Sequence, residues 1–204
     1  IFTWTALVTS VLIIATFPVL TATIAMLTLD RYFGFHFFTN DMGGSPMLYV
    51  NLIWTWGHPE VYILILPAWG IVSDLLSFFA RKPAFGAKST ALSMTAITIL
   101  STLVYGHHMY TTQMSPLLTQ TFMLLTMTIS IPSAVFFANW LGTLWKGAIR
   151  FHTPMLFSLG VVFVFGLGGL TGLYLATVTT DLYLHDTYFV VGHFHYTMAA
   201  SVLL

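Results

Sequence analysis

Six long apolar segments dominate the chain and restrict it to a membrane fold. They cover residues 2–29, 51–79, 89–111, 118–145, 154–178 and 187–204. All but the last exceed the ~20 residues that a helix needs to cross a bilayer. Only 6% of the residues are charged, whereas a soluble domain carries about a quarter. We therefore predict an all-α polytopic transmembrane helix bundle, in one partial domain over residues 1–204.

Composition narrows the chemistry that such a bundle supports. The chain has no cysteine, so any bound metal must take nitrogen or oxygen ligands. Its net charge is zero and it carries no basic stripe, so no nucleic-acid partner is expected. The sequence begins at Ile1 without an initiator methionine and ends at Leu204 inside an apolar run. We expect it to be part of a longer protein.

The basic residues predict how the bundle is oriented. Six helices leave five loops on alternating sides, and only Arg31 lies on the side of loops one, three and five. The other basic residues, in loops two and four, are Arg81, Lys82, Lys88, Lys146 and Arg150. Because positively charged loops stay on the inner side of a membrane, loops two and four are predicted to face the cytoplasm or matrix.

Five of the eight histidines lie inside the apolar segments, in three places: His58, the pair His107 and His108, and the pair His193 and His195. At 1.5 Å per residue, all five fall within roughly 5–15 Å of the outer surface. An imidazole is costly in hydrocarbon unless something binds it. Three helices of alternating direction thus bring rings to one layer, which favours a shared metal layer.

His58 and Tyr62 are four residues apart and share one helix face. A phenol beside a metal-bound imidazole can donate a proton and an electron; the alternative is a buried hydrogen bond between the two rings. Glu60 is the only carboxylate deep in the apolar interior, where it can relay protons. It can also be a structural carboxyl that bonds to a neighbouring helix. Pro59 either aims the His58 ring through a kink or serves packing alone.

His107 and His108 are adjacent, about 100° apart around a helix, and reach one ion only if it lies between their directions. With His58 they make a three-nitrogen site that suits copper or zinc, and imidazole also serves iron. The alternative places one ring inward and the other toward lipid or water.

His193 and His195 are two residues apart, roughly 200° around a helix, and cannot share an ion. Two flat macrocycles, one on each side, would use both rings as axial ligands. Glycines that let the backbone approach such planar groups, or that serve close helix packing, are Gly168, Gly169, Gly172 and Gly192.

His185 and Asp186 lie at the outer end of the last segment. They can hold a hard cation such as magnesium, together with waters or a partner's carboxylate. An exposed pair at the start of a helix is the alternative, and Asp186 is also well placed as a helix N-cap.

At these residues the chain resembles subunit I of the haem–copper oxygen reductases, in the branch that contains cytochrome c oxidase and the related quinol oxidases. The resemblance runs over nearly all 204 residues and corresponds to helices five to ten of a twelve-helix subunit. It rests on four motifs: Gly57 to Pro67, Gly106 to Met109, Gly168 to Gly172, and His185 to His195.

The resemblance implies a role for each histidine of the apolar layer. His58, His107 and His108 would ligate the copper called copper B. His193 would be the axial ligand of the high-spin, oxygen-binding haem, and His195 one axial ligand of the low-spin haem, whose other ligand lies outside this chain. The haem type is not readable from the sequence.

The resemblance also implies roles for polar residues around the metals. Tyr62 would be joined covalently to the His58 ring and donate a proton and an electron in O–O cleavage. Glu60 would pass protons to the site or to the pump. His185 and Asp186 would bind magnesium near the interface with subunit II, and Ser73 would lie at the entry of a lysine proton path.

Two positions depart from the family's pattern. The path lysine is replaced by Phe136, in the segment Pro132 to Phe136, where Ser133 keeps a hydroxyl. Tyr105 stands where the family has a tryptophan before the histidine pair. A phenylalanine carries no proton, so we hypothesise a substitute route along the third segment, through Thr98, Ser101, Thr102 and Tyr105.

By resemblance, the expected function is that of a terminal respiratory oxidase, which reduces O2 to water and translocates protons. Expected partners are oxidase subunits II and III, a cytochrome c or quinol donor, and the lipid bilayer. The missing lysine favours a bacterial plasma membrane over a mitochondrial inner membrane. Two rivals remain: a related enzyme that reduces nitric oxide, against which the Glu60–Tyr62 pair argues, and a non-catalytic metal-bearing or transport bundle.

Overall fold

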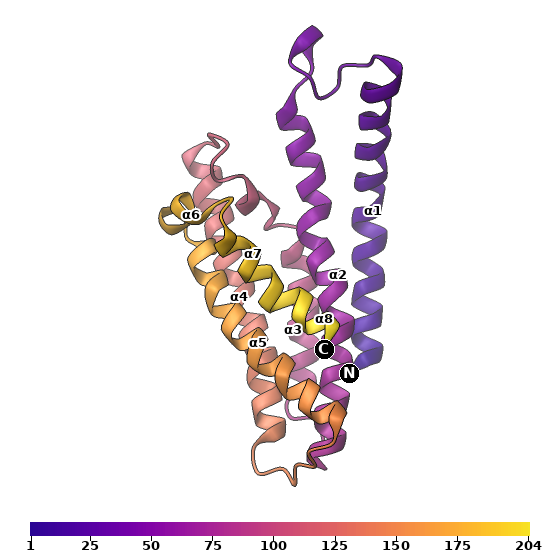
Figure 1. Cartoon of the computed structure of the whole chain (residues 1–204), viewed down its shortest axis with the longest axis vertical. Helices are drawn as coiled ribbons and strands as arrows, with labels where there is room; N and C mark the ends of the chain where they lie inside the picture. The colour runs from indigo at the N-terminus through magenta and orange to yellow at the C-terminus, as the bar shows by residue number, and fades with distance from the viewer.

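The computed structural model describes all residues, 1–204, as an all-helical bundle, which confirms the predicted fold class (Figure 1). Its five helical spans long and apolar enough to cross a membrane are α1 (Phe2–Phe33), α2 (Pro46–Ala80), the stretch Ala87–Met109, α4 (Pro116–Leu144) and α5 (Thr153–Ala176). The chain is therefore a multi-pass membrane protein.

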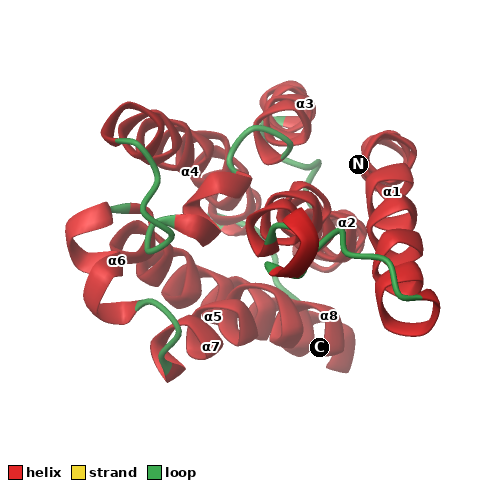
Figure 2. Cartoon of the chain, turned by 90° about the horizontal axis from the view of Figure 1, so that it is seen from above, coloured by secondary structure: helices red, strands yellow, loops and turns green.

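Helix α2 is the centre of the bundle. Seen from above, α1 lies on one side of α2, and the other long helices lie around its remaining faces (Figure 2). Helix α1 presents a stripe of buried residues with near-helical spacing to this neighbour: Thr5, Val8, Thr9, Leu12, Thr16 and Thr23. The four threonines of this stripe are small enough to let two helices approach closely, while Val8 and Leu12 supply its apolar contacts.

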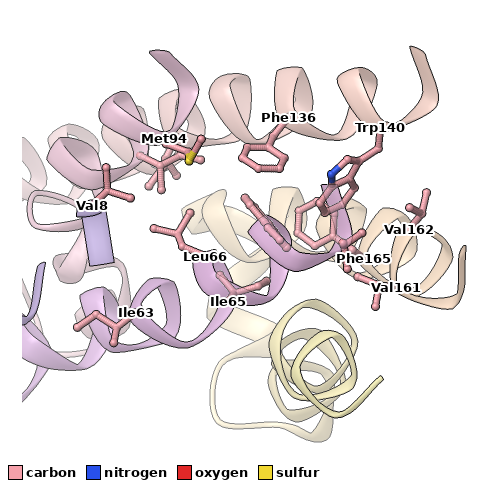
Figure 3. Packing of buried hydrophobic residues seen from close by; sticks show 14 of the residues in the cluster. Val8, Ile63, Ile65, Leu66, Met94, Phe136, Trp140, Val161, Val162 and Phe165 are labelled. Carbon is pink, nitrogen blue, oxygen red and sulfur yellow. The ribbon is translucent and has the colours of Figure 1, made fainter. Parts of the chain in front are cut away.

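An aromatic cluster packs α2, α4 and α5 together; it is formed by Trp69 of α2 and by Phe136 and Trp140 of α4 and Phe165 of α5, which are labelled in Figure 3. Ring centroids lie 4.8 Å apart for Trp69 and Phe136, and 4.7 Å apart for Trp69 and Phe165. Trp69 and Phe136 are each only 1% exposed. Tilted and edge-to-face rings at these separations are favourable beyond the area that they bury. The cluster joins three helices at one level.

The third apolar segment differs from the single helix expected over residues 89–111. Helix α3 (Ala87–Ser101) ends early, and after a short break the chain forms a 3₁₀ helix, η2 (Tyr105–Met109). A Cβ atom at Gly106 would overlap the ring of Phe122 on α4, so this turn packs too closely for any larger residue. The break moves the histidine pair from a continuous helix onto a tight turn.

The last segment is also divided. A short helix, α6 (Val178–Leu184), which the sequence did not predict, follows α5. Then come α7 (Tyr188–Phe194), a π-helical turn η3 (His195–Ala199), and α8 (Ala200–Leu203), which pack along α5. A π turn inserts an extra residue per turn and often occurs at functional sites. Here it begins at His195.

The five basic residues of loops two and four gather at the lower end of the bundle in Figure 1, where α2 and α4 end and α3 and α5 begin. Lys82 fixes part of this end, because its Nζ donates to the carbonyl oxygens of Gly142 and Trp145 at 3.0 and 2.6 Å. The loop from α1 to α2 and helix α6 lie toward the opposite end. The predicted orientation in the membrane depends on this grouping of the basic residues at one end of the bundle.

Candidate metal centre

Helix α2 and the turn η2 bring three histidine rings together. His58 Nδ1 lies 3.1 Å from His107 Nε2 and 3.4 Å from His108 Nε2, and the latter two atoms are 3.1 Å apart. His58 is buried and the other two rings are half-buried. Three mutually close ring nitrogens have too few protons to satisfy one another, and a cation at their centre would use all three lone pairs.

The positions of His107 and His108 differ from the geometry expected for an α-helix. On a continuous helix their directions would diverge by about 100°. The break before η2 turns both rings toward His58, and their centroids are 4.2 Å apart. Both rings of the pair therefore join the cluster, and neither turns away to lipid.

Neighbouring side chains fix two of the three rings. Thr126 Oγ1 donates to the carbonyl of Phe122, at 2.6 Å, and lies 3.0 Å from His107 Nδ1. Because the Thr126 hydroxyl proton is used in the bond to Phe122, the Thr126 oxygen can only accept a hydrogen bond from His107 Nδ1–H. The Nε2 atom of His107 is then unprotonated, and its lone pair points toward the other two histidines. His108 stacks on Trp54 with a centroid distance of 3.8 Å and an interplanar angle of 7°. These contacts hold the His107 and His108 rings in their orientation toward His58.

Replacing Thr126 with valine is expected to weaken metal binding at this cluster. The change removes the acceptor of His107 Nδ1–H but keeps the shape of the side chain, so the ring loses its fixed tautomer and orientation. Loss of such an outer contact typically lowers metal affinity by about 10- to 100-fold. If the cluster binds copper, as the family resemblance implies, the copper retained by the purified full-length protein during chelator dialysis measures the effect.

Thr128→Val is the matched control for this change. Thr128 is on the same helix and bonds to its own backbone in the same way, at 2.7 Å from the carbonyl of Leu124, but it is exposed. It should retain copper as the wild type does. Equal copper loss in both variants would show that the His107–Thr126 contact plays no part.

Tyr62 and Glu60 lie beside this cluster on α2. The ring centroids of His58 and Tyr62 are 4.9 Å apart, with the planes tilted by 52°. His58 Nδ1 faces the other histidines, and its second nitrogen, Nε2, is buried without a hydrogen-bond partner. The Glu60 carboxylate also has a buried oxygen, Oε2, without a partner. No hydrogen bond joins His58 to Tyr62, and the nearest donor to the Glu60 carboxylate is Trp56 Nε1, four residues earlier on α2.

His193 and His195 face different surroundings but share one feature. His193 Nδ1 lies 3.1 Å from the carbonyl of Gly168, and His195 Nδ1 lies 2.8 Å from the carbonyl of Val191. A carbonyl only accepts, so each ring must carry its proton on Nδ1 and leave Nε2 free to bind a metal. His193 is half-buried against α5, whereas His195 is exposed on the outside of the chain.

The four glycines named above divide between the two roles considered for them. A Cβ at Gly172 would lie 2.9 Å from His193 Cε1, and a Cβ at Gly168 would lie 2.8 Å from Tyr196 Cβ. These two glycines therefore serve close contact between α5 and the last segment. Nothing lies within 4 Å of a Cβ placed at Gly169 or Gly192. Only at the latter pair is there open space beside the backbone.

The structure contradicts one alternative considered for Asp186, its role as a helix N-cap. Asp186 has a positive φ of 56° and an exposed side chain, and the helix N-cap is Thr187, whose Oγ1 accepts from the amide of Phe189. His185 Nδ1 instead lies 3.0 Å from the carboxylate of Asp181, while its Nε2 is 3.9 Å from Asp186. Asp186 remains beside the ring but does not cap the helix.

Asp181 is a residue that sequence analysis missed. It is 3% exposed, and burial raises its pKa while the neighbouring His185 opposes the rise. Its spacing of four residues from His185 was the available signal, because that spacing puts two side chains on one helix face. The spacing could not be interpreted in this way because the sequence analysis predicted no helix between residues 178 and 187.

The hydroxyl groups of the two expected proton-path residues, Ser73 and Ser133, are already hydrogen-bonded to other groups of the protein. Ser73 Oγ donates to the carbonyl of Trp69 at 2.6 Å and accepts from Trp140 Nε1 at 2.8 Å. Ser133 donates to the carbonyl of its own helix at Ile129. Three hydroxyls of the hypothesised third-segment route likewise bond to carbonyls of their own helix, rather than to one another: Thr98, Ser101 and Thr102.

The three histidines gathered beside a tyrosine between membrane helices form a donor set that could hold a metal ion. A sequence profile of the family described as "Cytochrome C and Quinol oxidase polypeptide I" matches residues 1–204. The chain therefore belongs to the cytochrome c and quinol oxidase polypeptide I family, which confirms the resemblance seen in the sequence motifs.

Individual relatives agree with this assignment. The chain is 52% identical over 202 residues to the quinol oxidase subunit 1 of Bacillus subtilis, covering 99% of the chain and 31% of that protein. It is 49% identical over 202 residues to a probable cytochrome c oxidase subunit 1 of Bradyrhizobium diazoefficiens, covering 99% and 30%. With the cytochrome c oxidase subunit 1 of Cereibacter sphaeroides it shares 46% identity over 203 residues, covering 100% and 36%. The chain thus spans about a third of the length of these relatives.

Proposed function

We propose that this chain is the metal-binding part of the catalytic subunit of a terminal respiratory oxidase, which reduces O2 to water and translocates protons. The observation that carries the proposal is the convergence of His58, His107 and His108, with ring nitrogens 3.1–3.4 Å apart and Tyr62 against one of the rings. Relatives named as quinol and cytochrome c oxidases support it.

The donor set fits the metals that the family implies. Three imidazole nitrogens without a carboxylate or thiolate suit copper, and two further histidines with free Nε2 atoms, His193 and His195, suit haem iron. When bound, copper and two haems would supply the electron transfer and the open ligand positions that O2 reduction needs. The haem type, and magnesium at His185 and Asp186, belong to the same proposal.

Tyr62 is proposed to donate the proton and electron that complete O–O cleavage. Its ring lies against His58, whose Nδ1 is turned to the metal cluster and whose Nε2 has no other partner. That nitrogen is therefore free to be joined to a ring carbon of Tyr62, with loss of the N–H and C–H hydrogens as two protons and two electrons, which O2, the substrate of the proposed reaction, would accept. A covalent link would hold the phenol at the cluster and let charge pass between the two rings.

Glu60 is proposed to pass protons to this site or to the pump. Glu60 is two residues from His58, one of its carboxylate oxygens is buried without a hydrogen bond, and an intramembrane carboxyl is by default a candidate functional group. Ser73 and Ser133 remain candidates for a second path only if their present hydrogen bonds open. The alternative along the third segment would require the same of Thr98, Ser101 and Thr102.

The proposed partners follow from the family. Subunits II and III would complete the complex, and the donor would be a cytochrome c or a quinol, since relatives of both names match the chain. The sources of these relatives favour the bacterial plasma membrane as the location. In this proposal the chain contributes helices five to ten of a twelve-helix subunit.

Replacing Tyr62 with phenylalanine in the full-length complex tests the proposal. The wild type should show haem absorption bands and consume one O2 per four electrons. Tyr62→Phe should keep the haem bands and the copper but lose about 100-fold or more of its O2 uptake, the usual effect of removing a proton donor from a reaction. Tyr32→Phe, at a position 81% exposed, is the control and should be unchanged.

Two outcomes would contradict the proposal. A complex without haem bands would belong to the non-catalytic class of metal-bearing bundles. A complex that consumes nitric oxide faster than O2 would belong to the rival reductase class.

A further inference from the structure

A basic cavity lies at the inner end of the bundle, far along α2 from the histidine cluster. Its volume is about 490 Å³, within the range of small-molecule sites. It lies between the end of α2 and the start of α5, and its lining residues are Phe78, Phe79, Arg81, Arg150, His152 and Pro154. Two arginines and a histidine thus share one hollow with three apolar residues.

Neither arginine of this cavity has an acidic partner. The structure contains no ion pair of Arg81 or Arg150, and the two loops that carry them, residues 81–88 and 145–153, contain no aspartate or glutamate. The carboxylate nearest along the chain to Arg81, that of Asp74, lines a neighbouring hollow that shares Phe78 with this one, and it lies 3.3 Å from the nitrogen of Ile1. Within residues 1–204, the cavity therefore presents two guanidinium groups without a carboxylate partner.

The backbone holds the two arginines near each other. The amide of Arg150 donates to the carbonyl of Phe79 at 2.9 Å, and the amide of Ala148 donates to the carbonyl of Ala80 at 3.0 Å. Arg81 itself caps α2 in the left-handed conformation, with φ of 54°. Loop four is thereby tied to the last turn of α2, which fixes the relative positions of the two arginine backbones.

We propose that this cavity binds the phosphodiester headgroup of an anionic phospholipid from the inner leaflet. Guanidinium groups match phosphate oxygens in pairs of hydrogen bonds, and basic pockets between transmembrane helices on the inner side are typical headgroup sites. The start of α5 adds the positive end of a 24-residue helix at the Pro154 side of the cavity.

Apolar surface beside the cavity favours a lipid over free phosphate. Phe78 is 73% exposed and Phe151 is 69% exposed, both next to residues that line the hollow. The exposed Trp145 lies in the same loop region, and tryptophan is enriched at the level of lipid headgroups. If the arginines bound the headgroup, the acyl chains of the lipid would pack against these aromatic rings. Free phosphate has no acyl chain and would not make these contacts.

The test measures lipid binding to the purified, delipidated full-length complex by native mass spectrometry. Phosphatidylglycerol and phosphatidylcholine with the same acyl chains are added separately to the wild type and to a double variant, Arg81→Gln with Arg150→Gln. Phosphatidylglycerol should bind the wild type more tightly than phosphatidylcholine does. The double variant should lose about tenfold or more of that affinity.

Two controls complete the test. Lys88→Gln removes an exposed charge at the same end of the bundle but outside the cavity, and it should bind phosphatidylglycerol as the wild type does. Inorganic phosphate at millimolar concentration should not displace the lipid. The proposal fails if the double variant keeps its affinity, if Lys88→Gln loses as much, or if inorganic phosphate binds as tightly as the lipid.

Discussion

Replacing His58 with alanine in the full-length complex is expected to remove the copper bound at the histidine cluster and to abolish O2 uptake. Three nitrogens 3.1–3.4 Å apart act as one unit, and His58 Nδ1 is within reach of both others. Losing one of three ligands leaves only the adjacent pair on η2. Removing one residue of a group that acts as a unit costs nearly as much activity as removing the whole group. We therefore expect turnover to fall by roughly three orders of magnitude or more.

Metal analysis and absorption spectra separate this effect from misfolding. The haem bands should persist in His58→Ala, because His193 and His195 lie on the last segment and do not touch His58 Nδ1. His36→Ala is the matched control: His36 is exposed in the first loop, where its Nδ1 contacts only Thr39, at 3.1 Å. A His58→Ala complex that kept its copper and its O2 uptake would refute the proposed ligand set.

The sequence was sufficient to predict the bundle and the histidine cluster for a simple physical reason. Apolar runs longer than a bilayer is thick leave few folds, and the depth of each histidine follows from counting residues along a helix. That count placed His58, His107 and His108 in one layer. The structure joins the three rings within hydrogen-bond distance.

The details of the site depended on backbone breaks that carry no local sequence signal. The third segment breaks at Thr102 to Val104, without a proline or glycine at the break, and the π turn begins at His195 in an ordinary polar sequence. Both breaks arise where the chain packs against another helix, as at Gly106 against Phe122. Tertiary contacts of this kind override local propensity and are not visible in one sequence.

Phe136 shows what a departure from the family's pattern does to the surroundings. It is 1% exposed, its ring lies 4.8 Å from Trp69 and 5.3 Å from Trp140, and Ser73 nearby already donates one hydrogen bond and accepts another. No buried carboxylate faces it. The space that a proton-carrying side chain would need is filled by aromatic packing.

Phe136→Lys is therefore expected to destabilise the complex rather than to open a proton route. A lysine there would lose the ring contacts and place an ammonium among aromatic rings without a carboxylate partner. An uncompensated buried charge costs about 3–5 kcal/mol. The temperature at which the purified complex loses its haem absorption should fall by several degrees. The reduction rate of the high-spin haem should not rise.

Phe136→Leu separates the two contributions, because it removes the ring without adding a charge. It should lower the same temperature less than the lysine does, since only packing is lost. A lysine variant as stable as the wild type, with faster haem reduction, would contradict the prediction. It would mean that water can enter the aromatic cluster and that a lysine at position 136 is sufficient to open a proton route there. The expected result would mean that protons reach the metal site by a route that does not cross the aromatic cluster. Glu60 is the candidate residue for such a route that lies nearest to the metal site.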